Sequence, residues 1–193
     1  MNVQPRSVTV FAKTFLLFLA LLIVALFLIG GPVTGSVARG QGERVFENKV
    51  PKDLPFTIKI KKEKEESFKD LKNDNWLREF EVELTNTGDK PIYFFYLTMI
   101  SDVNVTGEPL VFPLTYGRAE LGNIVTKASP DDVPIKPGET YVLKVNSGSI
   151  EAWERAVKSQ RFPQVARLKG ILQALSFSDG TGYFGNESYP KGL

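Results

Sequence analysis

Residues 82–97 read VELTNTGDKPIYFFYL, two apolar runs on either side of a short polar segment. An Asn side chain bonds its own backbone two residues on, and Gly tolerates a positive φ, so Asn86 and Gly88 predict a turn. The run from Pro91 to Ile100 is nearly continuous in apolar residues and too short for a membrane-spanning helix. It therefore predicts a central strand that is covered on both faces.

Strict alternation of apolar and polar side chains predicts two strands before this turn. Residues 56–60 place apolar side chains on one side and Thr and Lys on the other, the pattern of a half-buried strand. Residues 76–84 alternate in the same way, with glutamates at 79, 81 and 83 on the outer face. If the strands pair, we expect Lys59 and Lys61 opposite Glu81 and Glu83. The mixed-charge stretch 61–75 is expected to be a solvated strand end and loop.

Turn residues divide the rest of the chain into short apolar segments. Pro137 and Gly138 predict a tight turn before an alternating strand. An apolar stripe at Ile150, Trp153 and Val157, with Ser149 placed to cap it, predicts a helix over 149–160. The other expected elements are strands at 109–114, 123–126, 140–145 and 165–177 and a terminal hairpin through Tyr183 and Phe184. Together these elements predict an all-β fold, an antiparallel β-sandwich with one short connecting helix.

The segment 82–97, followed by IKPGETYVLKV at 135–145, resembles the immunoglobulin-like β-sandwich modules of exported, largely uncharacterised bacterial proteins. The resemblance covers residues 56–185 at most and rests on the NTG and PGE turns. It implies an immunoglobulin-like sandwich in an extracytoplasmic setting and carries over no catalytic residue. The helix at 149–160 and the absence of the cysteine pair depart from the pattern of antibody domains.

Residues 15–29 read FLLFLALLIVALFLI, an unbroken apolar run preceded by Arg6 and Lys13. Its length lies between that of a signal-peptide core and that of a membrane-spanning helix. Small residues at Ser36 and Ala38 suit cleavage after Ala38. The N-terminal hydrophobic helix is therefore expected to be either a cleaved signal peptide or a membrane anchor. In both cases its basic residues stay on the cytoplasmic side and direct the rest of the chain outward.

The sequence therefore divides into three parts. Residues 1–38 are expected to be the signal peptide or anchor. If the segment is uncleaved, residues 15–33 are expected to anchor the chain in the membrane. Residues 39–52 are polar with scattered Gly and Pro, which predicts a linker. Residues 53–193 are expected to form the β-sandwich domain.

Charge and composition exclude several classes of function. The chain has 24 Lys and Arg against 22 Asp and Glu, and since only Arg6 and Lys13 precede Arg39, the remainder is formally neutral. That removes the electrostatic basis for binding nucleic acid. The chain has no His and no Cys, so it cannot form a Ser-His or Cys-His catalytic pair, a thiol redox motif or an ordinary zinc site. The lack of cysteine also favours a bacterial exported protein.

No cofactor and no metal site is expected. Asp102 begins a segment with the spacing of a calcium loop, but Pro113 stands where the loop needs a bidentate Glu. Residues 180–182, Gly-Thr-Gly, lack the Lys and the following helix of a phosphate-binding loop. The many carboxylates offer no means of selecting a catalytic pair.

Aromatic residues give the hint of a binding site. Tyr183, Phe184 and Tyr189 cluster in the expected terminal hairpin near Asp179, and Tyr116 is expected in a loop flanked by Gly. Exposed rings with a carboxylate nearby would suit sugar stacking or contact with a protein. The alternative is that these rings close the sandwich core, because aromatic residues dominate β-sheet interiors.

Three functions remain open at this point. The leading hypothesis is a non-enzymatic binding or structural module of the cell envelope, secreted or periplasmic if cleaved and otherwise single-pass membrane-anchored, with an envelope protein or polysaccharide as its partner. The second is a carboxylate-dependent hydrolase acting on envelope polysaccharide, which requires two acids of separated pKa in one cleft. The third is an accessory subunit that pairs through an exposed strand edge at residues 56–64 or 165–177.

Overall fold

A computed structural model describes residues 42–105, 107–160 and 163–191 of this chain. The apolar run at 15–29 and the cleavage site after Ala38 lie outside the described residues, so the signal peptide or anchor stays a prediction. Within the described residues, no helix is both long enough and apolar enough to cross a bilayer.

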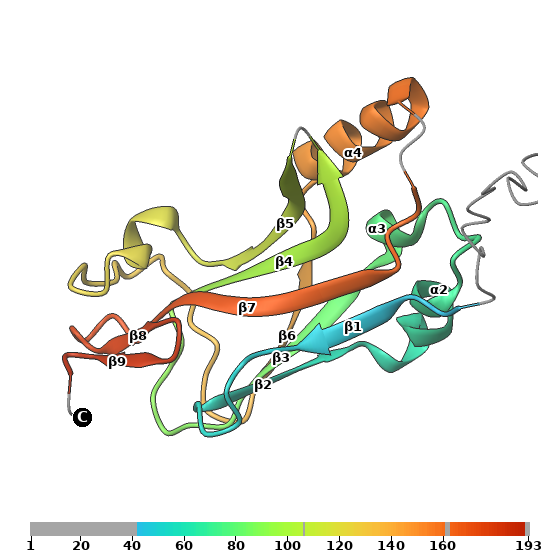
Figure 1. Ribbon diagram of the computed structural model, residues 1–193. Coiled ribbons are helices and arrows are strands. Elements are labelled where there is room, and N and C mark those ends of the chain that lie inside the picture. Colours follow the sequence, from blue (N-terminus) through green and yellow to red (C-terminus); the bar gives the residue numbers. More distant parts are fainter. Residues whose placement is uncertain (1–41, 106, 161–162, 192–193) are drawn as a thin grey trace, which may run out of the picture. The chain divides into compact units, whose positions relative to one another are not determined.

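Strands dominate the described residues and form two sheets (Figure 1). Their bounds are β1 Val45–Asn48, β2 Phe56–Ile60, β3 Glu81–Asn86, β4 Phe94–Val105, β5 Glu108–Tyr116, β6 Thr140–Lys144, β7 Arg167–Ser176, β8 Gly182–Phe184 and β9 Glu187–Tyr189. One sheet has the order β5-β4-β7-β8-β9, with β1 also paired to β7, and the other has the order β2-β3-β6. Pairing is antiparallel throughout these strands except between β1 and β7, which run parallel. The expected fold, mostly β and built from antiparallel sheets, is confirmed.

Short helical segments join the strands: η1 Lys62–Lys64, α2 Glu65–Lys69, α3 Trp76–Glu79, η2 Ala119–Gly122 and α4 Ser147–Gln160. Helices α2 and α3 lie at one end of the sheets, and β8 and β9 lie at the opposite end (Figure 1). The predicted helix at 149–160 is present as α4. It begins two residues earlier than expected, and Asn146 instead of Ser149 satisfies its first turn, because the Asn146 Oδ1 accepts a hydrogen bond from the Ser149 N–H at 2.9 Å.

Charge complementarity sets the register of the smaller sheet as the sequence predicts. The Lys59 Nζ lies 3.1 Å from a carboxylate oxygen of Glu83, and the Lys61 Nζ lies 3.3 Å from one of Glu81. Glu81 is nearly buried between Lys61 and Lys144, and the hydrogen bond from Lys144 is the main cause that holds the pKa of its carboxyl below the usual value. The outer face of β3 is therefore a row of paired charges.

Both predicted turns are present. The Gly88 N–H donates to the Asn86 Oδ1 at 3.0 Å, which is the expected Asx bond. In the second turn the Glu139 N–H donates to the Lys136 carbonyl at 2.9 Å, and Gly138 has a φ of +80°. The Asn86 N–H also donates to the Glu139 carbonyl. This bond joins the two turns at the point where the paired strands β3 and β6 meet them.

Residues 61–80 differ from the prediction. The charged stretch forms η1 and α2, and α3 occupies the start of the expected strand, so the strand begins at Glu81. Trp76 and Phe80 are four residues apart, a spacing that suits both an alternating strand and one face of a helix. Burial of Phe68, Trp76 and Phe80 against one another favours the helical arrangement, with ring centroids 5.0 to 6.4 Å apart. Glu79 consequently does not lie on a strand face and instead accepts hydrogen bonds from Ser67 and Asn73.

Two further segments also differ. The strand expected at 123–126 is absent, since these residues follow η2 as a turn in which the Thr126 N–H donates to the Asn123 carbonyl. Its apolar residue Ile124 is buried without joining a sheet. Residues 45–48, within the segment predicted to be a linker, form β1, which is held by parallel pairing to β7.

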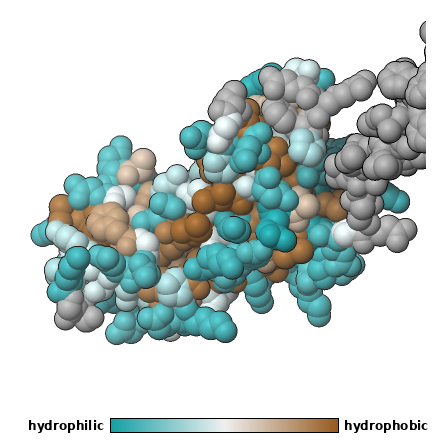
Figure 2. All heavy atoms as spheres, viewed as in Figure 1, coloured by the Kyte–Doolittle hydropathy of each residue, from teal (hydrophilic) through white to brown (hydrophobic). Residues whose placement is uncertain are grey.

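The core lies between the sheets and continues into the helical end of the domain. Trp76, Phe112 and Trp153 are in mutual contact there, with ring centroids 5.8 to 6.4 Å apart and edge-to-face geometry. A smaller cluster of Phe94, Leu121 and Ala174 covers the outer face of the larger sheet near η2. Elsewhere on that sheet, apolar surface reaches solvent along the face that carries β4 and β7 (Figure 2).

Two glycines with positive φ provide a matched test of this packing. Gly117 has a φ of +83°, and a Cβ at this residue would lie 2.0 Å from the Tyr93 carbonyl oxygen. Gly138 has a similar φ of +80°, and nothing lies within 4 Å of a Cβ there. We expect Gly138→Ala to lower the free energy of unfolding by about 1 kcal/mol through backbone strain, and Gly117→Ala to lower it by roughly 3 kcal/mol or more. Urea unfolding measures both, and equal losses would contradict the close approach at Gly117.

Candidate functional site

The five aromatic and acidic residues predicted to contact a ligand do not form one site. Phe184 and Tyr189 lie on β8 and β9 and are 48% and 39% exposed, with ring centroids 6.1 Å apart. Tyr183 points to the opposite face of β8, where it packs against Phe177 and the main core. The hairpin therefore presents one exposed aromatic pair, while Tyr183 has the structural role that the alternative interpretation gave it.

Asp179 and Tyr116 are engaged elsewhere. Burial alone would raise the pKa of Asp179, but hydrogen bonds from Lys90 and Thr181 together hold it below the usual value. Tyr116 is not in the expected loop, because it pairs with Phe95 as the last residue of β5, at the other edge of the larger sheet. Its ring packs there against Tyr141 with centroids 4.5 Å apart. Its hydroxyl donates a hydrogen bond to the Val133 carbonyl. Neither residue is placed to assist the exposed pair.

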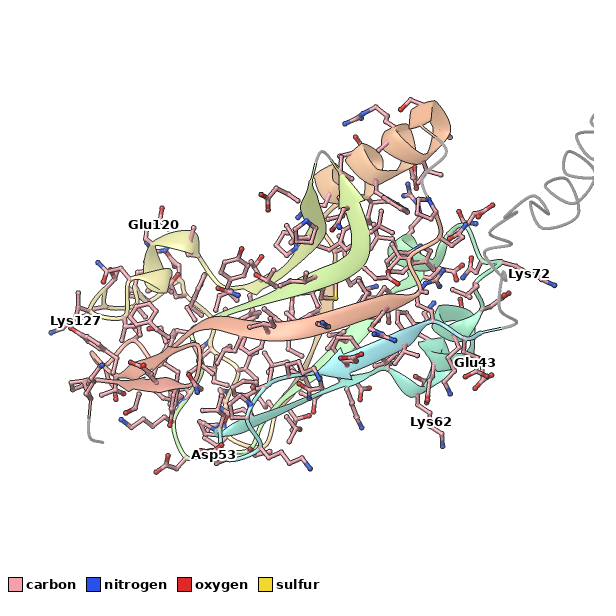
Figure 3. All side chains as sticks on the ribbon, in the orientation of Figure 1. Glu43, Asp53, Lys62, Lys72, Glu120 and Lys127 are labelled. Carbon is pink, nitrogen blue, oxygen red and sulfur yellow. The ribbon has the colours of Figure 1, made fainter. Side chains whose placement is uncertain are left out.

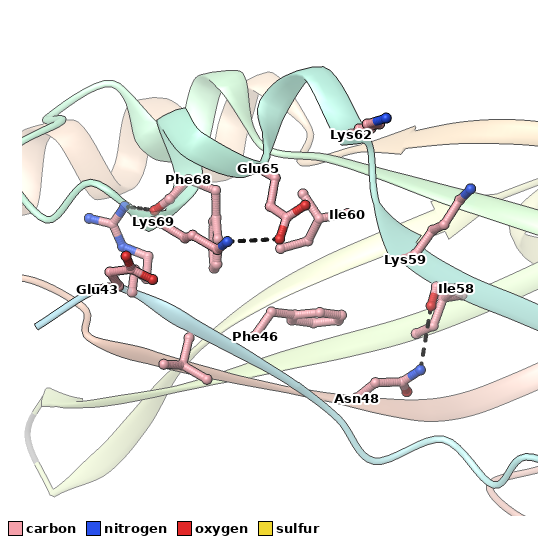
Figure 4. Close-up of a pocket in the computed structure, with 12 residues that line it drawn as sticks. Glu43, Phe46, Asn48, Ile58, Lys59, Ile60, Lys62, Glu65, Phe68 and Lys69 are labelled. Atoms are coloured by element: carbon pink, nitrogen blue, oxygen red, sulfur yellow. Dashed lines mark hydrogen bonds and ion pairs between the residues drawn. The ribbon is translucent and has the colours of Figure 1, made fainter.

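A hollow of about 600 Å³ lies between β1 and β2, beside η1 and α2, and we call it the β1–β2 groove. The residues that line it are Glu43, Arg44, Val45, Phe46, Asn48, Ile58, Lys59, Ile60, Lys62, Glu65, Phe68 and Lys69. At one end the strands are joined, because the Asn48 Nδ2 donates to the Ile58 carbonyl at 3.5 Å (Figure 4). Towards α2 the strands separate, and the hollow opens between them.

Strand β2 faces the groove with unpaired backbone groups. The Thr87 and Gly88 N–H groups donate to the Pro55 carbonyl, and the Lys61 N–H donates to the Glu81 carbonyl, so odd-numbered residues of this segment bond to β3. Even-numbered residues must point their backbone groups to the other side, because successive residues of a strand alternate. The N–H groups of Ile58 and Ile60 and the carbonyl of Ile60 therefore face the groove without a strand partner among the described residues.

Strand β1 faces the groove in the same way. The Val45 N–H donates to the Ala166 carbonyl, and the Lys49 N–H donates to the Gly170 carbonyl, so the odd-numbered residues bond to β7. The N–H and carbonyl of Phe46 consequently point away from β7 and towards the groove. Two sheet edges thus face one hollow with backbone donors and acceptors that no other described strand pairs with.

The groove has an apolar interior and a charged rim. Phe46 and Ile60 are partly buried, and Ile58 and Phe68 are buried. On the rim, the Lys69 Nζ lies 2.9 Å from the Glu65 Oε1, and the Lys59 Nζ lies 3.1 Å from the Glu83 Oε2. Lys59 and Lys62 extend away from the hollow (Figure 4), and charged side chains elsewhere, such as Glu120 and Lys127, also point to the periphery (Figure 3). The groove therefore offers apolar contacts and backbone hydrogen bonds.

Arg44 closes the α2 end of the groove and is 1% exposed. Its Nε donates to the Val165 carbonyl at 2.8 Å, and its Nη1 donates to the carbonyls of Phe68 at 2.6 Å and Asp70 at 3.2 Å. The guanidinium also lies over the Trp76 ring, 4.4 Å from its centroid, and its Nη2 has no hydrogen-bond partner among the described residues. Burial lowers the pKa of Arg44 to about 10, so the side chain remains charged at neutral pH.

The pKa shifts of the described carboxylates all have one direction. Where the pKa of a described Asp or Glu departs from its ordinary value, it is lowered, as for Glu79, Glu81 and Asp132, which accept hydrogen bonds. A general acid needs the opposite shift. Among the described residues, no group of three or more acidic side chains is placed to hold a metal ion.

Comparison with known proteins adds no relative: no protein family, no curated protein and no solved structure matches this chain.

The groove was not predicted from the sequence. No alternation marks this strand, because residues 44–48 read RVFEN with Val45 and Phe46 adjacent, and its parallel partner β7 lies more than a hundred residues away.

Removing the buried guanidinium tests its role in building the groove. We expect Arg44→Ala to lower the free energy of unfolding by about 3 kcal/mol or more, because it leaves the carbonyls of Phe68 and Val165 without their donor and removes a packed side chain. The matched control is Arg155→Ala on α4, whose side chain is 73% exposed. It is expected to change stability by no more than about 0.5 kcal/mol. Urea unfolding compares the two, and a small effect at Arg44 would overturn this account.

Proposed function

We propose that this protein is a non-enzymatic β-sandwich module of the bacterial cell envelope, exported or membrane-anchored, which binds a partner in the β1–β2 groove. The observation that carries the proposal is the groove itself: a hollow of about 600 Å³ with apolar walls between two incompletely paired strands. A soluble domain rarely leaves such a surface open unless something covers it.

The immunoglobulin-like resemblance is part of this proposal. Its support is the pair of turns at 86–88 and 136–139, which have the expected bonds, and the arrangement of strands in two sheets. The strand order departs from antibody domains, in which the second and third strands belong to different sheets. Here β2 and β3 are neighbours in one sheet, so the proposed likeness concerns architecture and turns.

The accessory-subunit hypothesis gains support from one of its two candidate edges. Strand β2, within the segment 56–64, has one neighbour, β3, whereas β7, within 165–177, has neighbours on both sides. The hydrolase hypothesis has no such observation, because no described pair of carboxylates is singled out by a raised pKa in a cleft. We therefore combine the first and third hypotheses and place the partner at β2.

Location can be tested independently of binding. We expect the chain to be found outside the cytoplasm, because Arg6 and Lys13 direct the remainder outward. N-terminal sequencing after fractionation distinguishes the two forms. A mature start at Arg39 in the soluble fraction would rule out the anchor, an intact N-terminus in the membrane fraction would rule out cleavage, and cytoplasmic recovery would contradict the proposal.

Binding is tested by the retention of detergent-solubilised envelope components on the full chain, immobilised in the same detergent so that an uncleaved N-terminal helix does not itself hold the chain to membrane. We expect Ile60→Lys, which puts a charge on the groove wall, to weaken association at least about tenfold. The control is Val111→Lys on β5, where the side chain is already 48% exposed and lies outside the groove lining. Ile60→Thr serves as a milder variant if the lysine disturbs folding.

Salt gives a second readout of the same interaction. Because residues 39–193 are formally neutral, the affinity should change less than about tenfold between 50 and 200 mM salt. Steep loss of binding over this range, or equal binding by the Ile60 and Val111 variants, would refute the proposed site.

A further inference from the structure

We infer that the occupant of the β1–β2 groove is an extended, uncharged polypeptide segment of a partner protein, which adds as a strand to the free edge of β2. This inference rests on the function proposed above and names the chemistry of the partner. The motivating juxtaposition is that unpaired backbone groups on β1 and β2 and an apolar lining face the same hollow.

The backbone groups have the spacing that a strand requires. Ile58 and Ile60 are alternate residues, so their outward groups are about 6.8 Å apart, the repeat of an extended chain. The Ile58 carbonyl is already occupied by the Asn48 side chain at 3.5 Å. The Ile58 N–H and both backbone groups of Ile60 remain for an added strand, and Phe46 offers a further donor and acceptor from the opposite wall.

The lining disfavours other ligands. An acyl chain would fill the apolar interior but would cut off the amides of Phe46 and Ile60 from water without replacing their hydrogen bonds, which is costly. A sugar needs an exposed ring and several polar side chains, whereas Phe46 is packed edge-on against Phe80, with ring centroids 6.0 Å apart. An extended peptide satisfies both requirements, since its backbone pairs with the edge and its alternate side chains enter the hollow.

Charge indicates that this segment is uncharged. Of the three lysines in the lining, Lys59 and Lys69 are paired with Glu83 and Glu65, and Lys62 extends away from the hollow (Figure 4). A charged peptide would therefore have to displace the ion pairs of Lys59 and Lys69. The edge of β5 provides a contrast, because Pro109 and Pro113 have no N–H to offer an added strand. The β2 edge carries no proline between Phe56 and Ile60.

The test uses the full chain, in lipid nanodiscs if it is retained in membranes, and two fluorescein-labelled probes. One is an end-capped peptide of four Thr-Val repeats, and the other is its twin with the amides of one edge N-methylated. We expect the first peptide to bind and the twin to bind at least about tenfold more weakly, because strand addition relies on backbone hydrogen bonds. Fluorescence anisotropy measures both affinities.

Two variants at one residue separate the backbone from the side chain. Ile60→Pro removes the outward N–H, and it suits the extended backbone of an edge strand. Ile60→Val keeps the N–H and most of the apolar surface. We expect a loss of at least about tenfold for the proline variant and less than about twofold for the valine variant. Hydrogen exchange provides a second measurement, in which the Phe46, Ile58 and Ile60 amides should exchange fast in the free protein and slow with peptide.

Each outcome decides between the two proposals. Equal binding of both peptides, equal binding by both Ile60 variants, or no peptide binding at millimolar concentration would overturn strand addition. If labelled lauric acid binds instead and Ile60→Lys abolishes that binding, the groove stands as a site for an apolar ligand. If Ile60→Lys also leaves envelope association unchanged, the proposed function fails as well.

Discussion

The buried guanidinium of Arg44 is the interaction on which the groove depends. It donates to the carbonyls of Phe68 and Val165, and it stacks on Trp76, so it ties β1 to α2 and to the segment that leads into β7. Burying this charge is expensive, and the hydrogen bonds, the ring and the nearby carboxylates of Asp70 and Asp102 offset the cost. At the other end the Asn48 side chain joins β1 to β2, and the hollow occupies the space between these two ties.

The open groove follows from the way the two sheets end. A sandwich of open sheets leaves edges, and proteins usually protect such edges with proline, charge or a covering segment. The β5 edge has prolines. The β8–β9 hairpin pairs with β7 at residues 174–176, past the residues 167–170 that pair with β1. The β1 and β2 edges have neither proline nor a covering strand in the part of the chain that the structure describes. Their apolar lining and free backbone groups make them the best candidate for recognition by strand addition.

Local patterns predicted much of the fold. The Asx turn at Asn86, the lysine–glutamate register between β2 and β3, and the helix α4 are all present, because each depends on residues within a few positions or on a strict alternation. The sequence predicts a solvated loop where η1 and α2 form, because that stretch has mixed charge without an apolar period, and it predicts a strand where α3 forms, because Trp76 and Phe80 fit a strand and a helix equally well. Which of the two forms was decided by burial of their rings against Phe68.

The candidate site was predictable only in part. The sequence offered two candidate edges, at 56–64 and 165–177, and β2 in the first has a single strand neighbour among the described residues. It also grouped the exposed aromatics Phe184 and Tyr189 with Asp179, Tyr183 and Tyr116, which the fold directs elsewhere. Alternation cannot show which face of a strand meets solvent once a second sheet or a loop packs on it.

The sequence by itself determined the turns, the alternating strands, the balanced charge and the absence of histidine and cysteine chemistry, because these are properties of neighbouring residues or of composition. Only the tertiary structure decided that β1 pairs in parallel with β7, that Arg44 is buried, and that two sheet edges enclose one groove. The physical reason is distance along the chain. Arg44 and Val165 are 121 residues apart, and a contact of that kind leaves no periodic signal near either residue.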